Sequence, residues 1–272
     1  MKPFDISGLI IPTLTPFTDD MSTVSEVRLA RHVRRLTESN PGGLLTAGAV
    51  GEFQSLANSE RKSLLEIVIR ESSNAIPVIQ NVTAVNTMGA LDMAQHAKRH
   101  GARAVIVAPP MYGDYTQSEL KQHFKTIANY CDLGVMIADD RNMIGPETRS
   151  ELEDHGAIKF VSPIGEICAE IATSETARPD EFTFGGNAFC SPVAIFEASE
   201  VREACSGGKR IAKASAYAAA IKQYGASRIA KLMMLELDIE IGPQRVPLQP
   251  PPREAILHLV AALQSSEKVV QD

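Results

Sequence analysis

Short apolar runs alternate with amphipathic stretches over most of this chain, and this alternation is what most constrains its fold. Strands are expected at 9–14, 43–47, 76–82, 104–108, 134–138, 157–161 and 182–185. Helices are expected between them, at 26–37, 59–71, 87–100, 117–131, 147–154 and 166–176. Strands that alternate with helices pair in parallel through right-handed crossovers. Seven of them favour a closed (β/α)8 TIM barrel.

An open doubly wound sheet is the alternative fold. It is disfavoured because no Gly-x-Gly-x-x-Gly follows the first strand, and we expect no cofactor. Beyond residue 208 the pattern is helical only, at 209–224, 227–239 and 253–266, with a proline-rich break at 242–252. The sequence therefore predicts a barrel over 1–207 and a C-terminal helical region over 208–272.

The last strand–helix unit of the barrel is expected to be shortened or absent. A barrel of this kind needs another helix and strand after residue 187, but the chain soon reaches Gly207 and Gly208. Either residues 187–193 supply an improvised closing strand, or the barrel closes imperfectly and its edge needs cover.

Composition excludes several classes of protein. The net charge of -6, with both signs interspersed, offers no basic stripe for nucleic acid. The four cysteines form no Cys-x-x-Cys pair, so we expect no metal site and a reducing compartment. The N-terminus lacks a signal-peptide pattern and no apolar stretch is long enough to span a membrane. The six histidines fall mostly on predicted helices, as surface or packing residues. We expect a cytoplasmic protein.

Lys159 lies in a predicted strand, between Gly156 and Val161, among apolar or small neighbours. An amine in an apolar strand is destabilised in its charged form, which lowers its pKa and makes the neutral nucleophile accessible. Schiff-base chemistry requires this form of the amine. The alternative is that Lys159 ends the strand and extends to solvent.

In a barrel the chemistry belongs at the carboxyl ends of the strands. The second strand is followed by Gly48-Ala49-Val50-Gly51, whose turn could direct backbone N–H groups at a carboxylate. Tyr112 follows the fourth strand, and Arg141 follows the fifth, where it could bind a substrate carboxylate. Ordinary loop roles remain open for all three segments.

Several short motifs occur in a consistent order: Thr15-Pro16-Phe17, Gly48-Ala49-Val50-Gly51-Glu52-Phe53, Pro109-Pro110-Met111-Tyr112, Ile158-Lys159 and Gly185-Gly186-Asn187. With these motifs the chain resembles the dihydrodipicolinate synthase and N-acetylneuraminate lyase family of class I aldolases and dehydratases. The resemblance implies that Lys159 forms a Schiff base with pyruvate or another 2-oxo acid.

The resemblance also assigns supporting roles. The Gly48–Gly51 loop and Gly186 match substrate-binding positions, Tyr112 matches a tyrosine of a proton relay across a subunit interface, and Arg141 lies where many members bind the distal part of the substrate. Members are commonly tetramers built from dimers, which implies a homo-oligomer here, a dimer or a tetramer.

The chain also departs from the family pattern. Ala49 and Val50 replace residues that commonly carry hydroxyl groups, and Ala138 aligns with the catalytic tyrosine of the fifth strand. Alignment on Gly165-Glu166 would put Val161, not Lys159, at the lysine position. Lys159 is preferred because this alignment loses no lysine, and because Lys159 and Val161 share one face of the strand.

The function expected from the sequence is a Schiff-base lyase that acts on pyruvate or a longer 2-oxo acid, such as a sugar-acid derivative, through Lys159. The first alternative is an inactive relative that serves in binding, regulation or assembly. The second is a 4-hydroxy-tetrahydrodipicolinate synthase, which is disfavoured because that reaction depends most directly on the missing hydroxyl relay.

Overall fold

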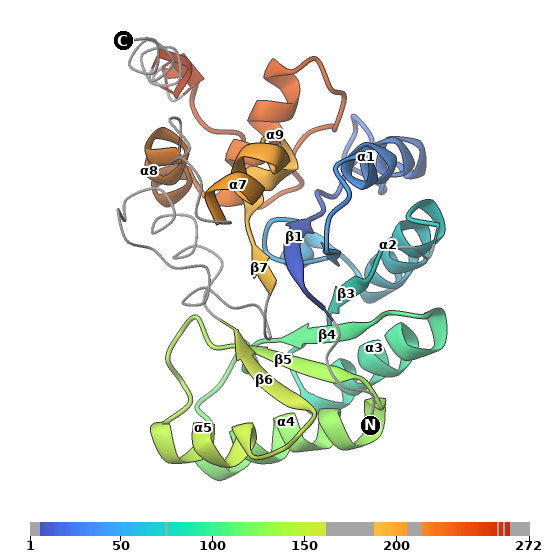
Figure 1. The fold of residues 1–272 in the computed structure, drawn as a ribbon, viewed down its shortest axis with the longest axis vertical. Helices are drawn as coiled ribbons and strands as arrows, with labels where there is room; N and C mark the ends of the chain where they lie inside the picture. The colour runs from blue at the N-terminus through green and yellow to red at the C-terminus, as the bar shows by residue number, and fades with distance from the viewer. Residues whose placement is uncertain are drawn as a thin grey trace.

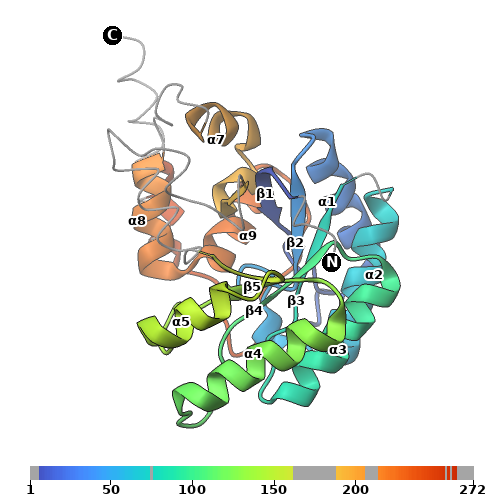
Figure 2. The same ribbon diagram turned by 60° about the horizontal axis from the view of Figure 1, so that its bottom comes forward.

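A computed structural model describes residues 6–73, 76–161, 188–205, 214–254, 256–257 and 259–261 of the chain. Its centre is a seven-stranded sheet in the order β6-β5-β4-β3-β2-β1-β7, and every neighbouring pair is parallel. The strands turn about a common axis and the helices lie outside them, as in a TIM barrel (Figures 1 and 2). The strands are β1 (Gly8–Pro12), β2 (Gly43–Thr46), β3 (Val78–Asn81), β4 (Ala104–Val107), β5 (Gly134–Ala138), β6 (Ile158–Val161) and β7 (Ala188–Cys190).

The first six strands confirm the predicted ones, and a helix follows each of β1 to β5. These helices are α1 (Glu26–Glu38), α2 (Asn58–Glu71), α3 (Thr87–His100), α4 (Gln117–Cys131) and α5 (Pro146–Glu153). The bounds of α3 show why the sequence locates them well. The Asn86 side chain accepts a hydrogen bond from the Gly89 N–H at its start, and Gly101 ends it in the left-handed conformation, at φ 92°. The predicted helix 166–176 and strand 182–185 lie outside the described residues.

β7 occupies the closing position beside β1. Gly8 pairs with Ala188 and Ile10 with Cys190, so a strand is present within the predicted segment 187–193. β6 and β7 are the two ends of the described strand order, so closure of the barrel between them stays a prediction. The chain then forms the short helix η3 (Pro192–Ile195) and α7 (Ala198–Cys205), which the sequence analysis did not predict. Two N–H groups of Arg35 on α1 hold this segment against the barrel through the carbonyl of Ile195, at 2.9 and 2.8 Å.

Side chains on the strands alternate between two hydrophobic clusters, as the pleat of a strand requires. One cluster fills the inside of the barrel, and the other packs the strands against the helices. The inner cluster consists of Ile6, Ile10, Leu45, Ile79, Ala104, Ile106, Met136, Val161 and Cys190. Membership of this cluster identifies which face of each strand looks inward.

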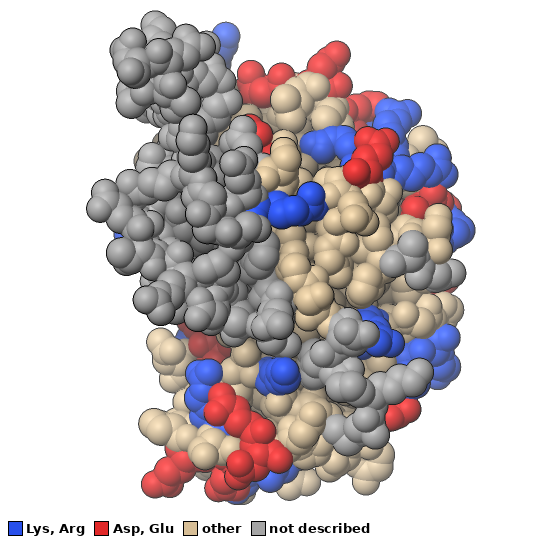
Figure 3. All heavy atoms as spheres, in the orientation of Figure 1, with Lys and Arg blue, Asp and Glu red and all other residues tan. Residues whose placement is uncertain are grey.

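The C-terminal part contains α8 (Ala214–Tyr224) and α9 (Ala226–Glu236), followed by further helical residues within 253–261. All three helices predicted there are present, with different bounds. The expected boundary at residue 207 lies outside the described residues, so the division into 1–207 and 208–272 stays a prediction. Positive and negative side chains intermingle over the described surface of the face in Figure 3. Among the described helices, none combines the length and the apolar character needed to span a bilayer.

Candidate active site

Lys159 lies on the inner face of β6. It pairs with Met136 of β5, a member of the inner cluster, and it shares its face of the strand with Val161, another member. The Lys159 side chain is nevertheless exposed. The desolvation expected from its apolar sequence neighbours is therefore not provided by the described surroundings.

The register between β5 and β6 determines what lies beside the strand ends. Ala138, the last residue of β5, pairs with Val161, the last residue of β6, and its methyl group packs against the inner cluster. The position that the resemblance gives to a catalytic tyrosine is therefore adjacent to a valine. Lys159 lies two residues earlier on β6.

The loop after β2, Gly48–Gly51, has no polar side chain, so only its backbone groups could bind a ligand. Gly48 and Gly51 are buried, Ala49 is exposed, and Val50 is buried in the outer hydrophobic cluster. The Thr15 hydroxyl donates to the Gly51 carbonyl at 2.6 Å, which fixes the end of the loop. A Cβ at Gly51 would lie 3.0 Å from the Thr13 carbonyl oxygen, so close packing favours glycine there.

Glu52 anchors this loop to the C-terminal helices, a role that the sequence analysis missed. It is fully buried in the left-handed conformation, at φ 57°, immediately before the short helix η1 (Phe53–Ser55). Its carboxylate lies 2.6 Å from Nζ of the buried Lys231 on α9. The Ser227 hydroxyl and the Arg245 backbone N–H donate to the same carboxylate, at 3.2 and 3.1 Å. No local motif signals this pair, since its members are far apart in the sequence.

Lys231 has the surroundings that the sequence analysis expected for Lys159. Its Nζ donates to the Pro243 carbonyl at 2.7 Å and lies 4.6 Å from the centre of the Phe17 ring. Burial lowers the pKa of Lys231, and the neighbouring Glu52 carboxylate opposes that shift. With these contacts, the Lys231 amine is committed to holding α9 against the barrel.

The polar residues after β3 and β5 are also engaged in shaping loops. Asn81 ends β3, where its amide donates to the Ala47 carbonyl at 2.8 Å and accepts from the Thr83 hydroxyl at 2.7 Å. Asp139 accepts from the backbone N–H groups of Met143 and Ile144, at 2.9 and 2.8 Å. The side chains of Asn81 and Asp139 thus form hydrogen bonds with backbone groups of this chain.

The remaining predicted site residues lie at the surface or outside the described residues. Tyr112 is 84% exposed, and the carbonyl group of Tyr112 accepts a hydrogen bond from the Tyr115 hydroxyl at 2.6 Å. Arg141 is exposed in the loop after β5. Gly186 lies outside the described residues. The Gly48–Gly51 loop is therefore held in place by its own contacts, such as the hydrogen bond from Thr15 to Gly51. Tyr112 and Arg141 are exposed at the surface.

Two histidines pack inside the molecule. Nε2 of His32 accepts a hydrogen bond from the Leu14 N–H at 3.2 Å, and Nδ1 of His123 lies 2.9 Å from the Thr87 hydroxyl. Burial lowers the pKa of His32 to about 3 and that of His123 to about 4. Both rings are neutral at physiological pH.

Comparison with known proteins gives consistent results. Residues 5–161 match the model of the dihydrodipicolinate synthetase family. The 4-hydroxy-tetrahydrodipicolinate synthase of Methanopyrus kandleri is 32% identical over 66% of this chain, and the match covers 61% of that relative's length. The enzyme of the same name from Brucella abortus is 28% identical over 75% of this chain and 76% of its own.

Solved structures extend the likeness to nearly the whole fold. A lysine-bound dihydrodipicolinate synthase from Cyanidioschyzon merolae superposes with a TM-score of 0.81 at 22% identity, covering 98% of this chain and 99% of that one. N-acetylneuraminate lyase from Fusobacterium nucleatum superposes with a TM-score of 0.76 at 15% identity, covering 96% and 98%. At these identities the likeness concerns the fold alone.

Proposed function

Because the chain belongs to the dihydrodipicolinate synthetase family, we propose that it is a lyase that forms a Schiff base with a 2-oxo acid through Lys159. The observation that carries this proposal is the position of Lys159 on the inner face of β6, paired with Met136. An amine there can attack the C2 carbonyl of the acid, and loss of water then gives an imine that serves as an electron sink. The backbone of the Gly48–Gly51 loop is the proposed partner of the acid's carboxylate.

Proton transfer would differ from the family pattern. Ala138, Ala49 and Val50 carry no hydroxyl group, and Asp139 is engaged with its own loop. The exposed Lys159 is open to water, which can carry the protons. Since a positioned acid or base contributes about 10²–10⁴-fold to rate, imine formation should persist while turnover is slow.

The proposed substrate is pyruvate or a longer 2-oxo acid, with Arg141 toward its distal part and Gly186 among the residues that bind it. A sugar-acid derivative is preferred to dihydrodipicolinate synthesis, which relies on the hydroxyl relay. Tyr112 is assigned to a neighbouring subunit's site. Its 84% exposure, together with exposed Val85 and Met111 on the loops after β3 and β4 and exposed Met88 in the first turn of α3, supports a homo-oligomer, a dimer or a tetramer.

A second candidate function is ligand binding or assembly without catalysis. It is favoured by the methyl group of Ala138 beside Val161, where the family pattern has a tyrosine, and by the burial of Val50 in the outer cluster. In this case the barrel would be retained for its surface and pocket, and Lys159 would form no imine.

Borohydride trapping separates the two candidates. The protein is incubated with pyruvate, and in parallel with longer 2-oxo acids, then reduced and measured by intact mass and peptide mapping. We expect one adduct per chain at Lys159, and its loss in Lys159→Met. Lys98→Met is the matched control, because Lys98 is also an exposed lysine, in an ion pair with Asp132. Absence of any adduct, or an adduct that persists in Lys159→Met, would contradict the proposed lyase.

A further inference from the structure

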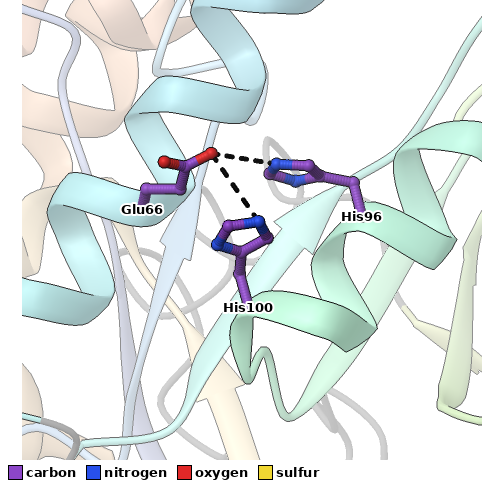
Figure 4. A group of neighbouring side chains, drawn as sticks. All are labelled: Glu66, His96 and His100. Atoms are coloured by element: carbon purple, nitrogen blue, oxygen red, sulfur yellow. Dashed lines mark hydrogen bonds and ion pairs between the residues drawn. The ribbon is translucent and has the colours of Figure 1, made fainter.

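Three side chains with metal-ligand chemistry meet on the outside of the barrel, between α2 and α3 (Figure 4). Glu66 comes from α2, and His96 and His100 come from the last turns of α3. The two histidines are four residues apart, so they lie one above the other on the same face of the helix. Their rings stack with centres 4.2 Å apart and planes inclined by 22°.

The ligand atoms are close enough to share one ion. Oε1 of Glu66 lies 3.0 Å from Nε2 of His96 and 3.8 Å from Nε2 of His100, and one ligand atom of each residue lies within 4.8 Å of the others. Zinc binds histidine nitrogen and carboxylate oxygen at about 2.0–2.2 Å, and tetrahedral geometry then separates neighbouring ligand atoms by roughly 3.3 Å. The two distances from Glu66 bracket that value, and the two imidazole nitrogens lie within 4.8 Å of each other, so rotation of the histidine side chains would bring all three ligand atoms to one ion.

We propose that Glu66, His96 and His100 form a binding site for a divalent transition-metal ion, with Zn²⁺ as the preferred occupant. Two imidazoles and a carboxylate suit zinc and its neighbours in the first transition row better than calcium or magnesium. Solvent completes the coordination, because the side chains of Glu66 and His100 are 45% and 41% exposed. The site has three protein ligands and an open fourth position.

The surroundings of His96 favour binding and limit its strength. Burial lowers the pKa of His96, which keeps the ring in the neutral form that metals require, although the hydrogen bond with Glu66 opposes the shift. Nδ1 of His96 is buried and makes no hydrogen bond, so no second partner orients the ring. Such partners typically contribute about 10–100-fold to affinity, so we expect micromolar rather than nanomolar binding.

The location indicates a structural or regulatory role. α3 ends at His100, and β4 begins at Ala104, so the site lies toward the amino-terminal ends of the strands. The chemistry of a TIM barrel belongs to the opposite end. The Lys62–Asp92 ion pair, at 2.7 Å, already joins the same two helices, and a bound ion would add a second clamp between them.

Equilibrium dialysis of the full chain against ZnCl₂ tests the site, with metal counted by mass spectrometry. We expect one ion per chain at micromolar free zinc, and at least a tenfold loss of affinity in each of Glu66→Gln and His100→Gln. Both side chains are partly exposed, so neither change should prevent folding. His155→Gln is the matched control, because His155 also contacts a side chain of a neighbouring helix, Asn129 at 3.0 Å, away from the site.

Two further readouts make the outcome decisive. Zinc at a hundredfold excess over its Kd should raise the Tm of the wild type by several degrees and that of His100→Gln by much less. Co²⁺ should give a visible absorption band of low-coordinate cobalt that depends on His100. Binding that is absent below about 1 mM zinc, or equal in both site variants and the wild type, would overturn the proposal and leave a hydrogen-bonded side-chain cluster.

Discussion

Two lysines in different regions of the molecule show how far local sequence can mislead about an amine. Lys159 has apolar neighbours along the chain, yet its side chain is exposed on β6. Lys231 lies in an ordinary amphipathic helix, yet it is 5% exposed, paired with Glu52 and placed over the Phe17 ring. Residues adjacent in a strand point to opposite faces, so they say little about what surrounds a side chain.

The two amines differ in their surroundings: Lys231 is buried in an ion pair, whereas Lys159 is exposed. Around Lys231 every charged or polar contact joins parts of the chain that are distant in sequence, so the region holds the fold together. The Lys159 side chain is exposed on β6, so water and a substrate can reach it. A reactive amine must be reached by its substrate, whereas a structural ion pair is buried between the elements that it joins.

Breaking the buried pair should have the largest effect on stability. Lys231→Met leaves the Glu52 carboxylate buried without its partner, which should lower the free energy of unfolding by about 3–5 kcal/mol. Lys159→Met should change it by less than about 0.5 kcal/mol, because the side chain is exposed. Urea unfolding of the two variants measures the contrast.

A double variant provides the control. Removing both charges, in Glu52→Gln with Lys231→Met, should recover part of the loss, because no unpaired charge stays buried. If Lys231→Met were no more destabilising than Lys159→Met, the pair would not anchor the loop, and the comparison between the two regions would fail.

Acidification should act next, through His32, which lies close enough to Lys231 for that charge to lower its pKa further. The unfolded histidine titrates near pH 6.5, and the folded one at about 3. The unfolded state therefore binds the proton first, and stability is complete above pH 6.5 and lost as the pH falls toward 3. The slope is about 1.4 kcal/mol per pH unit for one histidine.

Unfolding free energies of the wild type and His32→Gln at pH 7.5, 6.5, 5.5 and 4.5 isolate this contribution. The variant should be less stable at pH 7.5, and it should lose stability less steeply below pH 6.5. His123, with a folded pKa of about 4, continues to contribute in both proteins. Parallel pH dependences would mean that His32 has the same pKa in the folded and the unfolded state, and would contradict the prediction.

The barrel was predictable because its signals are local. Strand runs, helix periods, the Asn86 cap and the Gly101 stop each depend on neighbouring residues, and β5, α3 and α4 were predicted with their observed bounds. β7 was foreseen only as an alternative. α7 was not predicted, because the last strand–helix unit was expected to be shortened and no helix was assigned between residues 193 and 208.

The sites were less predictable because they depend on distant pairs. The Glu52–Lys231 pair joins residues of different helices and loops, and no spacing announces it. The cysteine spacing predicted no metal site, and the proposed site at Glu66, His96 and His100 contains no cysteine. The His96 and His100 spacing was visible, but its meaning depends on Glu66 of another helix.

The smallest predicted effect compares two arginines over aromatic rings. The guanidinium carbons of Arg245 and Arg149 both lie 4.2 Å from a ring centre, over Phe17 beside Lys231 and over Phe160 on β6. Their side chains are 13% and 53% exposed. Arg245 also donates to the Met21 carbonyl at 2.9 Å, the Ser55 carbonyl at 3.1 Å and Glu60 at 2.8 Å.

Replacement by lysine keeps the charge and removes the planar fork of donors. Arg245→Lys should therefore lower the free energy of unfolding by about 1–2 kcal/mol, because the partly buried carbonyl groups of Met21 and Ser55 lose their donors. Arg149→Lys should lower it by less than about 0.5 kcal/mol, since water replaces the lost contacts at an exposed site. Equal losses, measured by urea unfolding at pH 7.5, would show that the stacked ring rather than the buried hydrogen bonds determines the contribution of these arginines. The regions around Lys231 and Lys159 would then differ in how their lysines contribute to stability, but not in how their arginines do.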